Sequence, residues 1–475
     1  MTDCCPPGTP DSFDIIVVGA GSAGFSAAIT ASEQGASVAL IGHGMIGGTC
    51  VNVGCVPSKT MIRAAESIHG ARASSRFPGL EGEVTIAEWA KLTGAKDDLV
   101  TTMRQKKYID LLPEYEGVTY FEGEVQLTEG GVLINGTDVI KATKTIIATG
   151  SHSTLPPIPG IDDVPHLDST AALEIDAVPS SLMVIGGGVI GCELGQMFAR
   201  MGSDVTICCR SRLLPDMEPE VSEALKQALE EEGIAICAGV GYQKIEEVNG
   251  LIKLHCESDD SNHIVEAEKL LVATGRRPNT AELGLEKLGI EVDRNGGVKV
   301  DERMQSTRSN VYAAGDVTGS DMFVYMAAYG AKLAAKNALN SNSLSYDNSA
   351  MPAVVFTDPQ VASVGMTEEV ARDAGHNVKT SVVGLDNVPR AIAARDTRGL
   401  IKLVADEDSD RILGAHIIAP EGADSIQTAV LAIKFGMTAE ALGDTIFPYL
   451  TTVEGLKLAA QSFGKDVDKL SCCAG

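Results

Sequence analysis

Cys50 and Cys55 are the strongest candidates for reactive side chains in this sequence. They stand five positions apart in a segment that opens on Gly47-Gly48 and runs into a helix-forming stretch from Lys59 onward. Two thiols at this spacing can close a tight disulfide. The N-terminal end of a helix favours negative charge, so we expect a lowered thiol pKa and an available thiolate. A structural disulfide or two buried thiols are the weaker alternatives, because a glycine-rich phosphate-binding pattern stands directly upstream.

Two strand, glycine and helix units could bind the redox cofactors that such a pair needs. In the first, a strand at 13–18 leads into Gly19, Gly21 and Gly24; in the second, a strand at 181–185 leads into Gly186, Gly188 and Gly191. The glycines permit close backbone approach, and the helix N-terminus that follows holds a pyrophosphate. One chain with two such units predicts two bound dinucleotides.

The two units differ where the adenosine ribose is expected. After the second strand of the first unit, Gly42-His43 replaces the usual acid, and no cation is near, which suits FAD. His43 is either a substitute hydrogen-bonding group or an exposed loop histidine. In the second unit Arg210 and Arg212 follow the strand, which favours the 2′-phosphate of NADPH over NADH. The alternative is that both arginines are solvated loop charges.

The string from Gly47 to Lys59 resembles the active-site signature of the flavoprotein disulfide reductases. The resemblance implies an α/β fold, with two Rossmann-like dinucleotide-binding domains and a C-terminal α+β dimerisation domain. It also implies how the chain is divided: a flexible tail (1–12), an FAD-binding domain in two parts (13–150 and 280–350), an NADPH-binding domain (151–279), a dimerisation domain (351–465) and a flexible tail with a cysteine pair (466–475).

The resemblance also implies roles for single residues. Cys55 is then the thiol against the flavin ring and Cys50 the outer one. Lys59 lies near flavin N5 and pairs with Glu193. Asp316 accepts a hydrogen bond from a ribityl hydroxyl. The remaining cofactor-binding residues implied are Gly48, Thr49, Gly150 and Gly275.

The C-terminal region departs from the family members that act on disulfides. They carry a histidine five residues before a glutamate, whereas here Tyr449 stands five before Glu454. A phenol with a pKa near ~10 is a poor general base at neutral pH. This argues against a disulfide or dihydrolipoamide substrate. Soft thiolates select soft metals, and Cys472-Cys473 places two more thiols at the end of the chain, where chance neighbours or a strained disulfide are the alternatives.

These features resemble the mercuric-ion-reducing members of the family. The resemblance implies NADPH-dependent reduction of Hg(II) to Hg(0) through FAD in a homodimer with a composite active site. Cys472 and Cys473 of the partner subunit would deliver the ion to Cys50 and Cys55, past Tyr108 and the partner's Tyr449. A thiol-disulfide oxidoreductase of the same fold and a non-catalytic metal-sequestering protein are the competing hypotheses.

Composition limits the partners and the location. The 38 Lys and Arg against 64 Asp and Glu give a net charge of −26, which argues against nucleic acid and anionic membranes. The excess of acidic residues serves either to keep the protein surface soluble or, as the less favoured interpretation, to adapt the protein to high salt. Without an apolar run of membrane-spanning length or a signal-like N-terminus, we expect a cytoplasmic protein without membrane insertion.

The cysteines outside the central and C-terminal pairs have a plainer interpretation. Cys4-Cys5 is either a disordered tail or an extra capture pair. We expect five others to be small buried hydrophobic residues rather than metal ligands: Cys192, Cys208, Cys209, Cys237 and Cys256.

Overall fold

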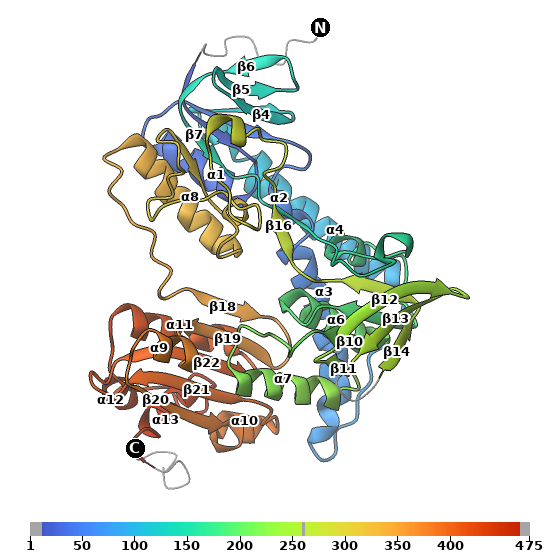
Figure 1. Cartoon of the computed structure of the whole chain (residues 1–475). Helices are drawn as coiled ribbons and strands as arrows, with labels where there is room; N and C mark the ends of the chain where they lie inside the picture. The colour runs from blue at the N-terminus through green and yellow to red at the C-terminus, as the bar shows by residue number, and fades with distance from the viewer. Residues whose placement is uncertain (1–11, 259–261, 466–475) are drawn as a thin grey trace. The chain divides into compact units, whose positions relative to one another are not determined.

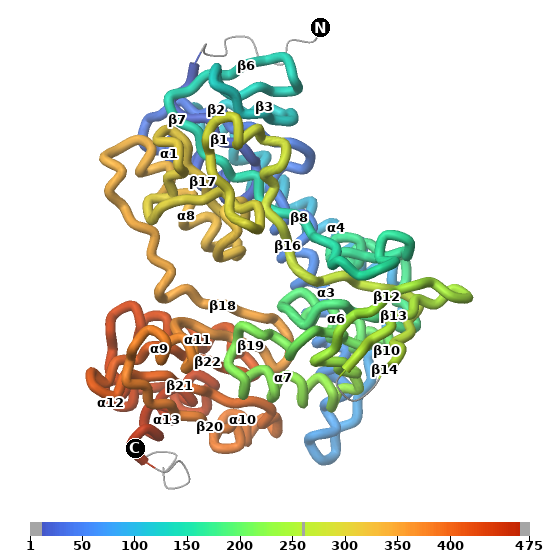
Figure 2. The backbone as a smooth tube through the Cα atoms, viewed as in Figure 1, coloured from blue at the N-terminus to red at the C-terminus, as the bar shows by residue number. Residues whose placement is uncertain are grey.

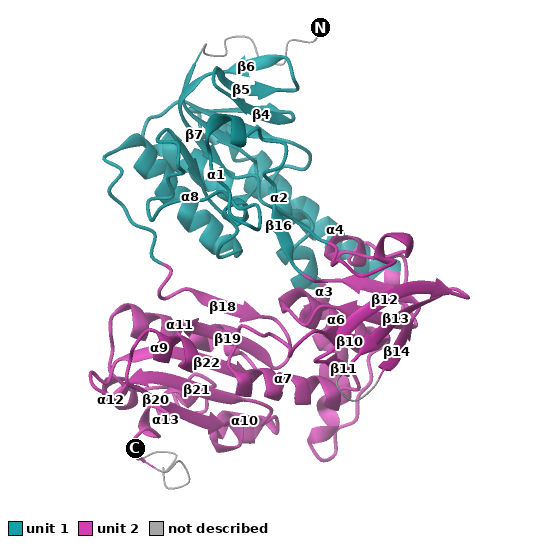
Figure 3. Cartoon of the chain, in the orientation of Figure 1, with its two compact units in different colours: residues 1–60, 90–154, 275–347 teal, residues 61–89, 155–274, 348–475 magenta. Residues whose placement is uncertain are grey.

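The computed structural model describes residues 12–258 and 262–465, so Cys4, Cys5, Cys472 and Cys473 lie outside the described residues. The chain divides into two compact units, each built from three separate stretches (Figure 3). Unit 1 is drawn from Met1–Thr60, Ala90–Thr154 and Gly275–Asp347, and unit 2 from Met61–Trp89, Leu155–Thr274 and Asn348–Gly475.

Unit 1 is organised around a five-stranded parallel sheet in the order β17-β7-β1-β2-β3 (Figure 1). Alternate residues of β1 enter two different apolar clusters, so this sheet is buried on both faces, as parallel sheets usually are. Alanine-rich α1 and α8 cover one face. The strands and helices are β1 (Phe13–Val18), β2 (Val38–Gly42), β3 (Val118–Glu122), β7 (Ala142–Ile147), β17 (Val311–Ala313), α1 (Ser22–Glu33) and α8 (Val324–Leu339).

Strand β17 shows how a late part of the chain returns to the first sheet. Val311 pairs with Thr145 and Ala313 with Ile147, in parallel register. Figure 2 shows β17 beside β7, although more than 160 residues separate them in sequence. The sheet is therefore completed only after the chain has passed through unit 2.

Smaller elements of unit 1 cover the second face of the sheet and carry the cysteine segment. The antiparallel strands β4–β6 contribute apolar side chains to the cluster on that face. These elements are β4 (Val125–Thr128), β5 (Gly131–Ile134), β6 (Asp138–Ile140), β8 (Ser151–Ser153), β16 (Arg276–Pro278), α2 (Gly48–Asn52), α4 (Trp89–Arg104), the π-helical turn η2 (Gln105–Ile109), and the 3₁₀ turns η3 (Leu112–Glu114), η5 (Glu286–Leu288) and η6 (Asp316–Thr318).

Helix α3 (Cys55–Arg72) begins in unit 1 and continues into unit 2. The 3₁₀ turn η1 (Ala73–Arg76) follows it, and the next helix in sequence is α4. The sequence pattern predicts two long helical stretches between residues 60 and 112 with a turn around residue 78, and the structure confirms this arrangement.

Unit 2 contains a four-stranded parallel sheet, β11-β10-β9-β15, and an antiparallel sheet, β12-β13-β14, that packs on one face of it. The shared core includes Met183 and Ile185 from the parallel sheet and Ile252 and Leu254 from the antiparallel one. The elements are β9 (Ser181–Ile185), β10 (Asp204–Cys209), β11 (Ala235–Ala238), β15 (Lys269–Val272), β12 (Gly241–Val248), β13 (Leu251–Glu257), β14 (Asn262–Ala267), α5 (Ser169–Ala172), α6 (Val189–Met201), α7 (Pro219–Glu231) and η4 (Ile161–Asp163).

The C-terminal part of unit 2 is an antiparallel five-stranded sheet in the order β18-β19-β22-β21-β20 with helices packed on it. Its elements are β18 (Pro352–Val355), β19 (Gln360–Gly365), β20 (Val378–Gly384), β21 (Leu400–Asp406), β22 (Ile412–Ala419), α9 (Glu368–Asp373), α10 (Pro389–Ala394), α11 (Gly422–Lys434), α12 (Ala439–Asp444), α13 (Glu454–Gln461) and the turn η7 (Leu385–Asn387).

The fold class predicted from the sequence is confirmed. Units 1 and 2 each contain a Rossmann-like α/β sheet, and unit 2 also contains the C-terminal α+β region. None of the helices in the described part of the chain has both the length and the apolar character needed to cross a membrane. Because parallel strands end at the same edge of a sheet, the glycine loops after β1 and β9 lie at the edges where such folds bind dinucleotides.

Candidate active site

The two central cysteines lie in unit 1, on consecutive helices. Cys50 is inside α2, and Cys55 is the first residue of α3. Both are half-buried and in the thiol form. The hydrogen bond between Cys50 and Cys55 raises the pKa of the Cys50 thiol, burial adds to the rise, and Lys59 opposes it only weakly. The expectation of a lowered thiol pKa is therefore wrong for Cys50, because two neighbouring thiols compete for the same stabilisation.

Asn52 fixes the loop that precedes these thiols, a role that the sequence analysis missed. Its buried side-chain amide donates to the carbonyl oxygens of Ile46 and Gly48, both at 2.9 Å. Arg104 Nη1 donates to Asn52 Oδ1 at 3.2 Å. Because three hydrogen bonds converge on one buried side chain, the backbone between Ile46 and Cys50 is held in one conformation.

Ser58 has a similar role inside the helix that Cys55 begins. Its Oγ donates to the carbonyl oxygen of Gly54 at 2.7 Å. That carbonyl lies just before Cys55, so the hydroxyl ties the first turn of α3 to the segment between the two thiols. Neither Asn52 nor Ser58 stands out by type or spacing, and only their contacts show what they do.

Tyr108, predicted to line the path of the ion, packs against the cysteine segment. Its hydroxyl lies 3.3 Å from Ser22 Oγ, and its ring makes an edge-to-face contact with Phe25 at 4.9 Å between centroids. A Cβ added at Gly47 would stand 3.1 Å from the tyrosine ring. Burial raises the pKa of the Tyr108 phenol, and the charges of Cys50 and Cys55 raise it further. The phenol therefore stays protonated beside the thiols.

The first glycine loop fits a bound pyrophosphate. A Cβ at Gly19 would collide with the carbonyl of Ala148, and one at Gly24 with the carbonyl of Gly19, so only glycine permits this close backbone packing. Gly21 caps α1 without a side-chain hydrogen bond, which leaves the amides of the first turn available to an anion. Gly48 approaches Gly21 closely, and Gly47 pairs with Gly21. The cysteine segment therefore lies directly on the nucleotide loop.

The structure also explains the missing acid after β2. A Cβ at Gly42 would stand 2.7 Å from both Ala20 Cβ and the Tyr120 hydroxyl, so a side chain there is excluded. In the parallel register Gly42 faces Glu122, an exposed carboxylate at the end of β3. His43 is exposed, 3.8 Å from Glu124 Oε1, which agrees with an ordinary loop histidine. Glu122 is thus a candidate that the search along β2 alone missed.

The second glycine loop repeats the first. A Cβ at Gly186 would collide with the carbonyl of Ala273, and one at Gly191 with that of Gly186. Gly188 caps α6 without a side-chain hydrogen bond. The repetition of the same close contacts indicates a second site of the same kind.

The two arginines after β10 differ in the structure. Arg212 donates from Nη2 to the carbonyls of Pro215, at 2.8 Å, and Met217, at 2.7 Å. Arg210 is exposed and has no hydrogen-bond partner within the described ranges. Arg212 thus holds its own loop, and Arg210 is the better candidate for a 2′-phosphate.

The predicted pair of Lys59 and Glu193 spans the two units, so it stays a prediction. Glu193 is buried on α6, where Oε1 accepts a hydrogen bond from the backbone amide of Phe356 at 2.9 Å. Lys59 lies on the first turns of α3, and Thr49 is exposed on α2.

The remaining residues of the predicted cofactor site lie at the exits of the two sheets. Asp316 Oδ2 accepts a hydrogen bond of 2.6 Å from Ser151 Oγ, which in turn accepts one of 2.8 Å from Arg276 Nε. Gly150 and Gly275 both have positive φ, +72° and +122°, and lead into the paired strands β8 and β16. These three segments of unit 1 are therefore held together.

The C-terminal residues Tyr449 and Glu454 differ in exposure. Glu454 is buried at the start of α13, and its Oε2 accepts a hydrogen bond from the backbone amide of Leu450 at 3.2 Å. Tyr449 is half-exposed. The glutamate therefore fixes the backbone next to Tyr449 and leaves the phenol ring at the surface.

Comparisons with known proteins agree with this arrangement. Residues 13–335 match the family described as pyridine nucleotide-disulphide oxidoreductase, and residues 351–460 match the dimerisation domain of that family. The mercuric reductase of Bacillus cereus is 47% identical over 465 residues, which cover 98% of this chain and 73% of that protein. The mercuric reductase of Streptomyces lividans is 43% identical over 468 residues, which cover 98% of both.

A solved structure gives the same result at the level of the fold. The Cu(II) complex of the HOCl-induced flavoprotein disulfide reductase RclA from Escherichia coli matches with a TM-score of 0.83 and 29% identity, over 95% of this chain and 99% of that one. The chain belongs to the pyridine nucleotide-disulphide oxidoreductase family and, within it, to the mercuric reductases.

Proposed function

We propose that the protein reduces Hg(II) to Hg(0) with NADPH as the electron donor. The observation that carries the proposal is the contact of Cys50 with Cys55 beside the protonated phenol of Tyr108. Two adjacent sulfurs bind a soft divalent ion well. Reduction of the ion consumes the two electrons of the hydride from NADPH, which becomes NADP⁺, and one proton is released.

The C-terminal region supports a metal ion over a disulfide as the substrate. Disulfide reduction needs a group that gives and takes protons, and a phenol at the place of Tyr449 serves this purpose poorly near neutral pH. A metal ion held by thiolates makes no such demand. The mercuric reductases, which match nearly the whole chain, point to the same substrate.

The glycine loops would hold the two dinucleotides. Gly19, Gly21 and Gly24 with the N-terminus of α1 would hold the pyrophosphate of FAD, and Glu122 would take up the ribose in place of the acid missing after β2. FAD supplies, when bound, a two-electron relay between nicotinamide and thiols. Gly186, Gly188 and Gly191 would hold the pyrophosphate of NADPH, and Arg210 its 2′-phosphate.

The ion would reach the thiols by ligand exchange in a homodimer. Cys472 and Cys473 of the partner subunit capture Hg(II), and Cys50 takes it over before Cys55 joins. Each transfer forms one sulfur–metal bond as another breaks, so the ion is never without thiolates. The dimerisation domain at residues 351–460 supports a dimer.

The decisive measurement is NADPH-dependent release of mercury vapour from the purified flavoprotein. Cys472→Ala combined with Cys473→Ala should impair turnover of thiol-complexed Hg(II), while NADPH still reduces the flavin. Unchanged steady-state rates in that double variant would refute the delivery step. High activity with lipoamide and none with Hg(II) would refute the function itself.

A further inference from the structure

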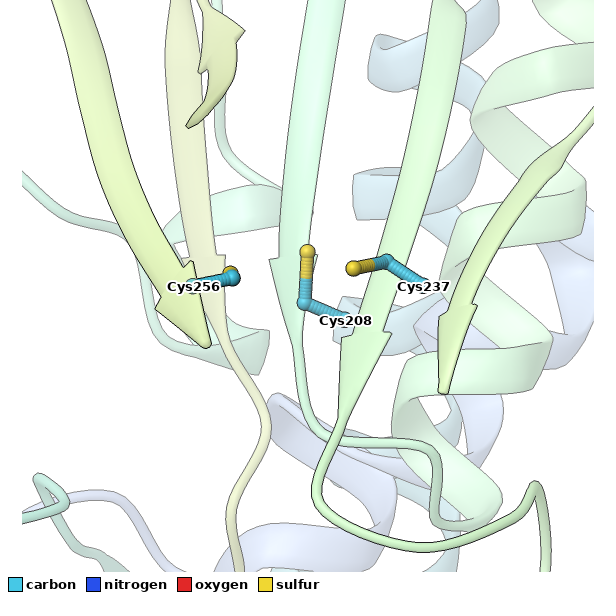
Figure 4. A group of neighbouring side chains, drawn as sticks. All are labelled: Cys208, Cys237 and Cys256. Atoms are coloured by element: carbon cyan, nitrogen blue, oxygen red, sulfur yellow. The ribbon is translucent and has the colours of Figure 1, made fainter. Parts of the chain in front are cut away.

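Three cysteines of unit 2, outside the site described above, come together at the junction of its two sheets. Cys208 on β10 and Cys237 on β11 are register partners in the parallel sheet, so their side chains leave the same face. Cys256 lies on β13 of the antiparallel sheet that packs on this face. The three sulfur atoms lie within 4.8 Å of one another (Figure 4).

A histidine lies beside the group. His263 on β14 is the cross-strand partner of Cys256, and its Nε2 lies 3.0 Å from the sulfur of Cys237. The three sulfurs and this neighbouring imidazole therefore come from four strands whose pairing fixes them, rather than from a loop. The spacing of Cys208, Cys237 and Cys256 in sequence gives no hint of this, because the two intervals between them differ in length.

The cluster is buried but reachable from one side. Cys208 and Cys256 are buried in an apolar core, whereas Cys237 and His263 are half-buried. β11 and β14 are the edge strands of their sheets. An ion would therefore enter past Cys237 and His263 and meet the two buried thiols behind them.

The ligand set selects the class of ion. Thiolate ligands favour soft cations, and three cysteines supply the sulfur ligands of a tetrahedral Zn(II) site of the Cys₃His type. Sulfurs at about 2.3 Å from one tetrahedral ion stand roughly 3.8 Å apart, so the cluster has to contract only slightly. A hard cation such as Mg(II) prefers oxygen ligands and is excluded by this chemistry.

We propose that Cys208, Cys237 and Cys256, with His263 beside Cys237, form a second metal site, for a thiophilic divalent cation, in unit 2. Binding forms three sulfur–metal bonds as the three thiol protons pass to solvent. The site does not rest on the proposed function, since its ligands are distinct from Cys50 and Cys55. The expectation of buried thiols is confirmed for Cys192, Cys208, Cys209 and Cys256, whereas Cys237 is half-buried.

The test uses the full chain with every other reactive pair removed, that is with alanine at positions 4, 5, 50, 55, 472 and 473. This protein is dialysed against Zn(II) alone or Hg(II) alone, and the retained metal is counted by mass spectrometry. We expect about one tightly held ion per chain. If the protein retains Zn(II) and Hg(II) displaces that ion, the site is structural. If the protein retains Hg(II) but no Zn(II), the site is selective for heavy soft ions. Both results support the proposal. Retention of neither overturns the proposal.

Matched variants locate the ion. The substitution Cys237→Ser, at a half-buried position, should abolish retention of the metal ion. The substitution Cys192→Ser, which removes a buried thiol outside the cluster, should leave metal retention unchanged. Equal retention in both variants overturns the proposal. Should Cys237→Ser fail to fold, judged by circular dichroism, X-ray absorption of the parent chain decides: three sulfur neighbours around the ion support the site, and two or fewer refute it.

Discussion

Arg104 donates a hydrogen bond of 3.2 Å to the side-chain oxygen of Asn52, and so connects the end of α4 to the helix that carries Cys50. The two residues are 52 positions apart in sequence. Asn52 is 6% exposed, and its amide nitrogen is fully used by two backbone carbonyls. The cysteine segment is thus positioned by a buried polar network as well as by its glycines.

Replacing Asn52 by alanine should therefore loosen the segment. The carbonyls of Ile46 and Gly48 lose their donors, and an unsatisfied buried polar group costs about 1–3 kcal/mol. We expect Asn52→Ala to lower the thermal unfolding midpoint and to slow Hg(II)-dependent NADPH oxidation. Asn377→Ala, at an exposed asparagine, serves as the control and should change neither. Equal effects of the two substitutions would contradict the role of the network.

Substitutions of the two arginines after β10 should have different effects on the preference for NADPH over NADH. Arg210→Ala should weaken NADPH use roughly ten- to a hundredfold, since a hydrogen bond to a charged group contributes about 1.5–3 kcal/mol. Use of NADH, which has no 2′-phosphate, should stay the same. Arg212→Ala should instead lower stability, because its donors hold the carbonyls of Pro215 and Met217. Steady-state kinetics with both nucleotides decide this, and a loss of NADPH preference only in Arg212→Ala would reverse the assignment.

Tyr108→Phe tests what the phenol does beside the thiols. The ring contact with Phe25 is kept, and the hydrogen bond to Ser22 Oγ is lost, so stability should fall by no more than about 1.5 kcal/mol. Because burial and the nearby thiols raise the phenol pKa, the hydroxyl acts as a neutral ligand or donor and not as a base. We expect turnover to drop several-fold with an unchanged pH profile between about pH 6 and 9. A profile that loses a basic limb would show that the phenol titrates.

Lys402 lies at the centre of a buried charge cluster in the C-terminal sheet. Its Nζ is within 3.0 Å of carboxylate oxygens of Glu218, Glu220 and Glu368. Lys402→Met removes the cation shared by Glu218 and Glu220 and leaves Glu368 paired only with Arg372, which should cost about 3–5 kcal/mol. Lys253→Met removes a partly exposed pair with Glu266 and should cost less than about 1 kcal/mol. Denaturant unfolding of the two variants measures the difference.

The same cluster predicts a pH dependence. Burial raises the pKa of Glu220, but the hydrogen bond from Lys402, a backbone hydrogen bond and the charge of Lys402 together outweigh it, and the net shift is downward. Hydrogen bonds from Arg372 and Lys402 lower the pKa of Glu368. Groups with a lowered folded-state pKa stabilise the protein above their ordinary value of 4.5 and lose that contribution as the pH falls through the folded-state pKa. In Lys402→Met the carboxylates of the cluster repel one another, so their protonation at low pH stabilises the variant. The stability gap between wild type and variant should therefore narrow from about pH 7 to 4, and a gap that widens would contradict the assignment.

Much of the fold was readable from local patterns. The strand at 13–18, the strand at 181–185 and the glycine triplets after them appear in the structure at the predicted positions. These features are readable because a fully buried parallel strand needs an unbroken apolar run, and the turn after it needs glycines at fixed offsets. The thiol pair could also be predicted locally, because the order of residues from Gly47 to Lys59 is enough to indicate it.

The two nucleotide-binding folds, the central thiol pair and the family could therefore be predicted from the order of residues alone. The contacts that depend on pairing between distant strands and helices became visible in the folded chain: Asn52 with Arg104, Glu122 opposite Gly42, and the meeting of Cys208, Cys237, Cys256 and His263. The physical reason is that strand register and sheet packing bring together side chains whose separation along the chain carries no period. The type of a residue shows which ligand its side chain could bind, and the fold decides which side chains can bind the same ligand.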